Sequence, residues 1–243
     1  MAAPTLVLLH GVGLDHTVWE PVAELLRDDF QIATPDLPGH GARPPASPGT
    51  TLADLATGVV NEIRPGSHVV GFSLGALVAQ HLAVHRPELV ATLISVSSVC
   101  QRTEAERAAV LRRLDSAMQD PAASTAASLH RWYDGTGVSQ ERIRATEATL
   151  SANDPDSFAH CYRVFATGDA EIGTHLGEIR IPSLAVTGEC DPGSTPEMTH
   201  RLARAIPDCT AEVIPGARHM LPIQKPRELV TSVSDFLRRY AHG

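Results

Sequence analysis

Short apolar runs alternate along this chain with segments in which apolar residues recur at helical spacing. The expected buried strands cover residues 5–10, 30–36, 68–73, 89–98, 182–189 and 210–216. The expected helices cover residues 18–28, 51–63, 74–85, 196–206 and 226–240. Strands separated by helices form parallel sheets, which need helices on both faces to exclude water. The alternation therefore predicts an α/β fold with a mostly parallel sheet of about six strands.

Residues 99–180 interrupt this alternation. The segment is rich in Ala, Arg and Glu and has no continuous β run, and helices are expected at 103–120 and 156–166. An insertion of this kind can cover the mouth of a site. We therefore expect one core domain, made of residues 1–98 and 181–243, with residues 99–180 as a helical lid.

The charge balance argues against polyanionic partners. The 28 acidic and 20 basic residues give a formal net charge of -8, and no Lys/Arg-rich run occurs. Nucleic acids and anionic membranes attract basic surfaces, so we expect neither as a partner. No apolar run reaches the roughly 18 residues of a membrane-spanning helix. The expected partner is a small-molecule substrate, and the chain is expected to be a monomer or a homodimer.

The four cysteines lie far apart and form no CxxC pair. This spacing is typical of reduced thiols, and the N-terminal residues do not have the pattern of a signal peptide. Both observations predict a cytoplasmic location. No HExxH motif and no Cys/His cluster occur, so we expect no metal and no cofactor.

The third expected strand ends in Gly71-Phe72-Ser73-Leu74-Gly75, and a helical pattern follows at once. A G-x-S-x-G sequence between a strand and a helix is typical of a nucleophile elbow, which lifts the serine above the sheet. Small residues are needed because bulky Cβ atoms would clash in so tight a turn. The helix N-terminus also brings partial positive charge to the site. We predict that Ser73 is a catalytic nucleophile.

A serine hydroxyl is a weak nucleophile and needs a base. Asp191 and His219 lie just beyond the last two expected strands, where the loops of a parallel sheet gather around a site. We predict that His219 takes the proton of Ser73 and that Asp191 orients the His219 ring. Glu189 is a weaker alternative to Asp191 because it lies closer to the strand itself.

An oxyanion hole needs two backbone N–H groups directed at one point. Leu74 follows the nucleophile directly and is expected to supply one of them. Val12, in the loop after the first strand, is expected to supply the other, with His10 and Gly11 shaping that loop. The G-x-G triplet in this loop lacks the rest of a dinucleotide-binding fingerprint.

With these motifs the chain resembles the α/β-hydrolase superfamily over nearly its full length. The matching segments are LLHGVG, PDLPGHG, GFSLGA, TGECDPGSTPE and PGARHMLP. The resemblance implies the α/β-hydrolase fold, a Ser-His-Asp triad with an acyl-enzyme intermediate, and scaffold roles for Asp36 and His40. Only four residues precede TLVLL, so the two antiparallel strands that usually open this fold have no sequence here, and we expect a shortened sheet.

The segments RWYDG (131–135) and YRVFATGD (162–169) are similar to those of enol-lactonase-type hydrolases, such as 3-oxoadipate enol-lactonase. This resemblance implies a small ester, lactone or related carbonyl substrate, a carboxylated enol-lactone among them. Arginine pairs well with carboxylates, so Arg131 and Arg163 are expected to bind substrate, and Trp132 is expected to wall the pocket. Two enzymatic alternatives stay open: a lyase that uses the triad for proton abstraction, as in the menaquinone-pathway synthase, and a carbon–carbon bond hydrolase.

Overall fold

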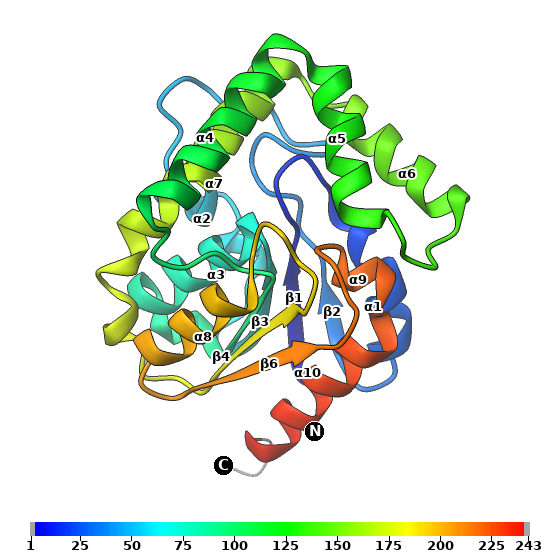
Figure 1. Cartoon of the computed structure of the whole chain (residues 1–243). Coiled ribbons are helices and arrows are strands. Elements are labelled where there is room, and N and C mark those ends of the chain that lie inside the picture. Colours follow the sequence, from blue (N-terminus) through cyan, green and yellow to red (C-terminus); the bar gives the residue numbers. More distant parts are fainter. Residues whose placement is uncertain (1–2, 241–243) are drawn as a thin grey trace.

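The computed structural model describes residues 3–240, and in this range six strands form one sheet in the order β2-β1-β3-β4-β5-β6 (Figure 1). The strands are β1 (Thr5–Leu9), β2 (Gln31–Ala33), β3 (Ser67–Phe72), β4 (Val90–Val96), β5 (Ser183–Gly188) and β6 (Cys209–Ile214). Every pairing between neighbouring strands is parallel. The α/β fold and the six strands expected from the sequence are confirmed. Along the described part of the chain β1 is the first strand, and no antiparallel pair of strands precedes it.

Helices cover both faces of the sheet because the strands are apolar on both. In β1, Val7 and Leu9 pack into one core cluster, whereas Leu6 and Leu8 pack into the other. The first cluster is covered by α2 (Leu52–Thr57), α3 (Leu74–His85) and α8 (Pro196–Ala205). The second is covered by α1 (Glu20–Leu26), α9 (Leu221–Gln224) and α10 (Pro226–Tyr240). Short 3-10 helices occur at His16–Trp19, Val60–Glu62, Pro87–Leu89 and Leu176–Glu178.

The continuous helix expected over residues 51–63 is wrong. The Thr51–Asp54 capping box starts α2 as expected, but the helix ends at Thr57, before Gly58. Glycine has a low helix propensity, and the β-branched residues that follow Gly58 also have a lower helix propensity than Ala or Leu. Val59 and Ile63 are nevertheless buried. The apolar spacing thus identified the buried residues correctly, but it did not show that the helix ends within the segment.

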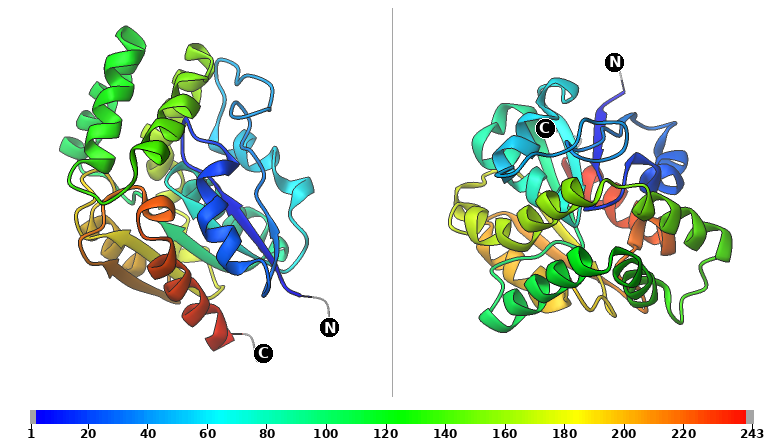
Figure 2. Two further views of the ribbon diagram at one scale, coloured as in Figure 1. Left: turned by 90° about the vertical axis from the view of Figure 1, so that its right-hand side faces the viewer. Right: turned by 90° about the horizontal axis from the view of Figure 1, so that it is seen from above.

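Four helices lie between β4 and β5: α4 (Glu104–Gln119), α5 (Pro121–Tyr133), α6 (Gln140–Ser151) and α7 (Pro155–Gly173). Side chains that accept backbone N–H groups cap the start of each helix, from Thr103, Asp120, Ser139 and Asp154. The two views of Figure 2 show these helices gathered over one end of the sheet. We call α4–α7 the helical insertion. Across residues 3–240, the structure contains no helix with the length and apolar character of a membrane span.

Candidate active site

Ser73 stands at the sharp turn between β3 and α3. Its backbone has φ 55° and ψ -112°, a conformation that L-residues rarely adopt, and its N–H donates to Val96 O at 2.9 Å. A Cβ added to Gly71 would lie 2.2 Å from Gly75 O, and a Cβ added to Gly75 would lie 2.3 Å from Leu9 O. Both contacts are with backbone, which cannot move aside. The packing explains why glycine occupies both positions around this serine.

Asp191 and His219 meet in the loops that follow β5 and β6. His219 Nδ1 lies 2.7 Å from Asp191 Oδ2, and both residues are buried. The other oxygen, Asp191 Oδ1, accepts the N–H groups of Gly193 and Ser194, each at 2.9 Å. Because a carboxylate only accepts, Nδ1 carries the proton, and Nε2 is left as the free acceptor of the neutral ring.

Glu189, the alternative acid, is exposed, and its Oε2 accepts the Gly216 N–H at 2.9 Å. Glu189 is therefore bound to the loop after β6, and among residues 3–240 it has no hydrogen bond to the His219 imidazole. Of the two acids considered, the structure brings Asp191 to His219.

Ser73 and His219 line the same cavity, and aromatic rings hold the imidazole beside it. The ring centroids of Phe72 and Trp132 lie 5.1 and 5.6 Å from that of His219. Ser97 Oγ also donates to the His219 backbone oxygen at 3.3 Å. Within residues 3–240, no hydrogen bond joins Ser73 Oγ to the His219 ring. Such bonds are often long in ligand-free sites and tighten when substrate binds.

The turn after β1 lies directly against the nucleophile. A Cβ added to Gly11 would lie 3.2 Å from Ser73 Cβ, and Val12 lines the cavity. Leu74 is the first residue of α3, so its N–H belongs to the first turn, where donors have no acceptor within the helix. Burial lowers the pKa of His10, whose neutral ring lies under this turn. Val12 thus follows the residue that packs against Ser73, and Leu74 follows Ser73 directly in the chain.

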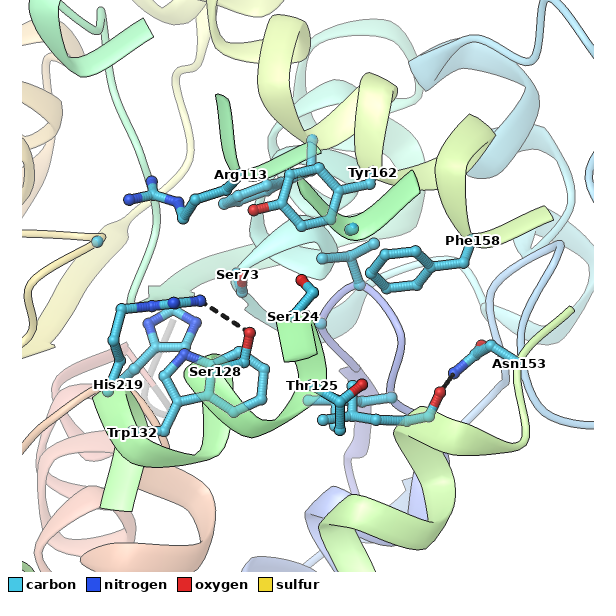
Figure 3. Close-up of a pocket in the computed structure, with 18 of the residues that line it drawn as sticks. Ser73, Arg113, Ser124, Thr125, Ser128, Trp132, Asn153, Phe158, Tyr162 and His219 are labelled. Atoms are coloured by element: carbon cyan, nitrogen blue, oxygen red, sulfur yellow. Dashed lines mark hydrogen bonds between the residues drawn. The ribbon is translucent and has the colours of Figure 1, made fainter. Parts of the chain in front are cut away.

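The cavity has a volume of about 300 Å³ and is shared between the core and the helical insertion (Figure 3). Its lining includes apolar and aromatic side chains, among them Leu14, Leu150, Phe158, Tyr162 and Phe165. It also includes polar side chains, among them Arg113, Ser124, Thr125, Ser128, Arg131 and Asn153. A cavity of this size and lining suits a small substrate with an apolar part and a polar part.

Of the three residues expected to bind substrate, two line the cavity and one does not. Arg131 and Trp132 line the cavity, whereas Arg163 is exposed on α7 and is not among the lining residues. Successive residues of a helix are turned by about 100°, so Tyr162 faces the cavity and Arg163 does not. Arg113, which was not expected from the sequence, lines the cavity instead. Arg113 lies four residues before Ala117 and so next to the buried residues of α4. This helical spacing could have identified it from the sequence.

Two arginines therefore line the same cavity without an acidic partner among the described residues. Arg131 Nη2 donates to Ser128 Oγ at 2.7 Å, and neither Arg113 nor Arg131 forms a salt bridge among the described residues. Burial lowers the pKa of Arg131, and the neighbouring positive charge of Arg113 lowers it further. In the same range of residues, no group of three or more His, Cys, Asp or Glu side chains is arranged to hold a metal ion.

Two curated bacterial proteins are similar to the chain over nearly its whole length. The (E)-2-((N-methylformamido)methylene)succinate hydrolase of Acinetobacter baylyi is 29% identical over 236 residues, covering 96% of this chain and 89% of that protein. The pimeloyl-[acyl-carrier protein] methyl ester esterase of Aromatoleum aromaticum is 28% identical and covers 98% of this chain and 100% of that protein.

Solved structures share the same fold. The enol-lactonase from Burkholderia xenovorans LB400 superposes with a TM-score of 0.86 at 23% identity, covering 98% of this chain and 92% of that chain. An esterase from Exiguobacterium antarcticum superposes with a TM-score of 0.87 at 15% identity, over 98% and 92% of the two chains. The model of the alpha/beta hydrolase family matches residues 6–232. The chain therefore belongs to the alpha/beta hydrolase family and is an enzyme of the hydrolase class.

Proposed function

We propose that this protein is a serine hydrolase that cleaves a small ester, lactone or related carbonyl substrate through Ser73, His219 and Asp191. The observation that carries the proposal is the buried His219–Asp191 pair, 2.7 Å apart, on the same cavity as a serine in a strained strand-to-helix turn. The helical insertion would serve as a lid, residues 99–180, over a core made of residues 1–98 and 181–243.

The mechanism follows from the roles that these groups can take. Ser73 Oγ attacks the carbonyl carbon while His219 Nε2 accepts its proton, and Asp191 stabilises the imidazolium. The N–H groups of Val12 and Leu74 donate to the oxyanion, and one such donor contributes about 10²–10³-fold in rate. His219 then gives its proton to the leaving oxygen. A water molecule, activated by the same imidazole, releases the acyl group and restores Ser73.

The substrate is proposed to carry a carboxylate, as a carboxylated enol-lactone does. Arg113 and Arg131 support this view because two unpaired guanidinium groups at one cavity attract an anion. The relative from Acinetobacter baylyi is named for a succinate derivative, which is a dicarboxylate, and a structural neighbour is an enol-lactonase. The small cavity also favours a compact substrate over a long acyl chain.

The proposal is tested with the Ser73→Ala variant, assayed against short p-nitrophenyl esters and carboxylated enol-lactones. We expect kcat to fall by at least about 10⁴-fold, because loss of the nucleophile removes the covalent route. A Ser116→Ala variant, altered at an exposed serine of α4, serves as the control.

Two further readouts test the proposed reaction and the proposed nucleophile. Product mass should show the addition of one water molecule, whereas a lyase would add none. A fluorophosphonate should label Ser73, which tests the nucleophile, although a lyase that uses the same triad would be labelled as well. Turnover that persists in Ser73→Ala would remove this serine from the mechanism.

A further inference from the structure

The turn that carries Val12 is short and rich in glycine. Leu14 N–H donates to Gly11 O at 3.2 Å, which closes a four-residue turn over residues 11–14. Gly13 has a φ of +74° at the third position, as type II turns require. Glycine gives a chain wide conformational freedom. A turn of this composition therefore needs contacts from outside to hold one orientation of its N–H groups.

The core holds the first residue of the turn. His10 is fully buried, and its Nδ1 donates to Gly11 O at 2.8 Å. On the other side of the ring, Nε2 accepts the Leu37 N–H at 2.9 Å. These two bonds require the neutral ring with its proton on Nδ1, which agrees with the lowered pKa that burial gives His10. The start of the turn is thus tied to β1 and to the loop after β2.

The helical insertion holds the other end. Asn153, between α6 and α7, donates from Nδ2 to Gly13 O at 2.8 Å. The same nitrogen donates to Thr149 O and Leu150 O, each at 3.0 Å, at the end of α6. All three partners are carbonyl oxygens, so only the amide nitrogen fits this position.

The turn also packs against the insertion around this hydrogen bond. A Cβ added to Gly13 would lie 2.7 Å from Phe158 Cε2 and 3.0 Å from Leu150 Cδ2. Both side chains belong to helices of the insertion and line the cavity. Gly13 is therefore in contact with the insertion through its carbonyl oxygen and through its Cα.

We propose that Asn153 is a positioning residue for the oxyanion hole. By holding Gly13 O, it fixes the turn so that Val12 N–H is directed at the oxyanion only when the insertion is seated on the core. The inference rests on the proposed function, because it assigns Asn153 a role in the same reaction. Under this inference, Asn153 of the insertion sets the orientation of the Val12 N–H group in the core, although the two residues are 141 positions apart in the chain.

The expected size of the effect follows from the geometry that an oxyanion hole needs. Donors must lie about 2.7–3.1 Å from the oxyanion, and loss of a whole donor costs about 10²–10³-fold in kcat. A displaced donor keeps part of its contribution. We therefore expect kcat to fall by about 10- to 100-fold when Asn153 loses its donor.

The test compares Asn153→Asp with Asn153→Leu in the full-length enzyme. The aspartate has the same shape but places an oxygen against three carbonyl oxygens, and the leucine has a similar size without a donor. Ala152→Asp is the matched control, because it adds the same charge at an exposed neighbouring position. For each variant we would measure kcat, KM, the melting temperature, and the inhibition constants of a boronic acid and of the reaction product.

The boronic acid separates positioning from folding because it forms a tetrahedral adduct with Ser73 and uses the oxyanion hole, whereas the alcohol product, which is the product measured here, has no acyl oxygen to place there. The proposal expects boronic acid affinity to fall by the same factor as kcat, with KM and product affinity within about threefold. Unchanged kcat in both variants would overturn it, as would equal losses for the boronic acid and the product. Turnover by Ser73→Ala would instead refute the proposed function, so the two failures are distinct.

Discussion

At the scale of single residues, the cavity owes its charge to Arg113 of α4 and Arg131 of α5. Both guanidinium groups also line an outer groove between these two helices, so they stand where the cavity and the groove meet. This arrangement makes the two arginines the residues that select the substrate under the proposed function.

Replacing Arg113 by methionine tests this selection. A hydrogen bond to a charged group contributes about 1.5–3 kcal/mol, so kcat/KM for a carboxylated ester should fall by about 10- to 100-fold. The value for a neutral ester of equal size should stay within about threefold. Arg112→Met, at the exposed neighbouring position of α4, removes the same charge and is the control. Equal losses for both esters would argue against carboxylate recognition by Arg113.

At the scale of elements, a buried ion pair fastens α7 to the chain that enters α4. Arg102 Nη1 lies 2.7 Å from Asp169 Oδ1, and the two side chains are 2% and 0% exposed. Asp169 Oδ2 also accepts the Arg102 N–H at 2.8 Å, and Arg107 Nη2 lies 3.3 Å from this oxygen. The Arg102 guanidinium lies 4.7 Å from the ring centroid of Phe165, a residue of the cavity wall. The pair therefore links the packing of the insertion to the site.

Asp169→Asn should lower the free energy of unfolding by about 3–5 kcal/mol, because it leaves the positive charge of Arg102 buried without a counterion. The double variant Arg102→Met/Asp169→Leu should recover most of this loss, since apolar side chains can replace a buried pair. Urea unfolding followed by circular dichroism measures both. A single variant as stable as the parent would show that the pair contributes little to stability.

At the scale of the whole molecule, buried histidines make stability depend on pH. Burial, together with the nearby His10 ring 5.1 Å away between centroids, lowers the pKa of His40 to about 3. In the unfolded chain a histidine titrates near its ordinary value of about 6.5. Between these two values the unfolded chain binds a proton that the folded chain does not. Stability therefore rises with pH in this window and is lost as the pH falls below about 6.5.

The His40→Asn variant should lose less stability on acidification than the parent. Each such histidine contributes up to about 1.4 kcal/mol per pH unit between about pH 6 and pH 5. Asparagine can keep the donor that His40 Nδ1 provides to Pro38 O at 3.1 Å. Urea unfolding at several pH values gives the two slopes. Identical slopes for variant and parent would remove His40 from the acid response.

Local motifs were the most predictable part of the site. Ser73 follows from five consecutive residues around a strand-to-helix turn, and Asp191 and His219 follow from their places after two strands. The sheet was predictable because both of its faces are buried, which leaves continuous apolar runs in the sequence. The end of α2 was not, because the same apolar spacing continues through a helix break.

Residues of the insertion were less predictable. Arg163 and Arg113 look alike in sequence, and only the packed orientation of α7 and α4 shows that the first is exposed and the second lines the cavity. Asn153 has no local pattern at all, because its partner Gly13 is 140 positions away. Contacts of this kind depend on how helices rotate and dock, which many distant side chains decide together.

The α/β alternation, the six strands and the turn that raises Ser73 could be predicted from the sequence, because each depends on residues that are neighbours along the chain. Only the folded chain shows that Asp191 and not Glu189 meets His219, that Arg113 and not Arg163 lines the cavity, and that Asn153 donates to Gly13 O. The physical reason is that a hydrogen bond or an ion pair needs atoms within a few ångströms of each other. For residues far apart in the chain, only the packing of the helices and loops on the sheet sets that distance.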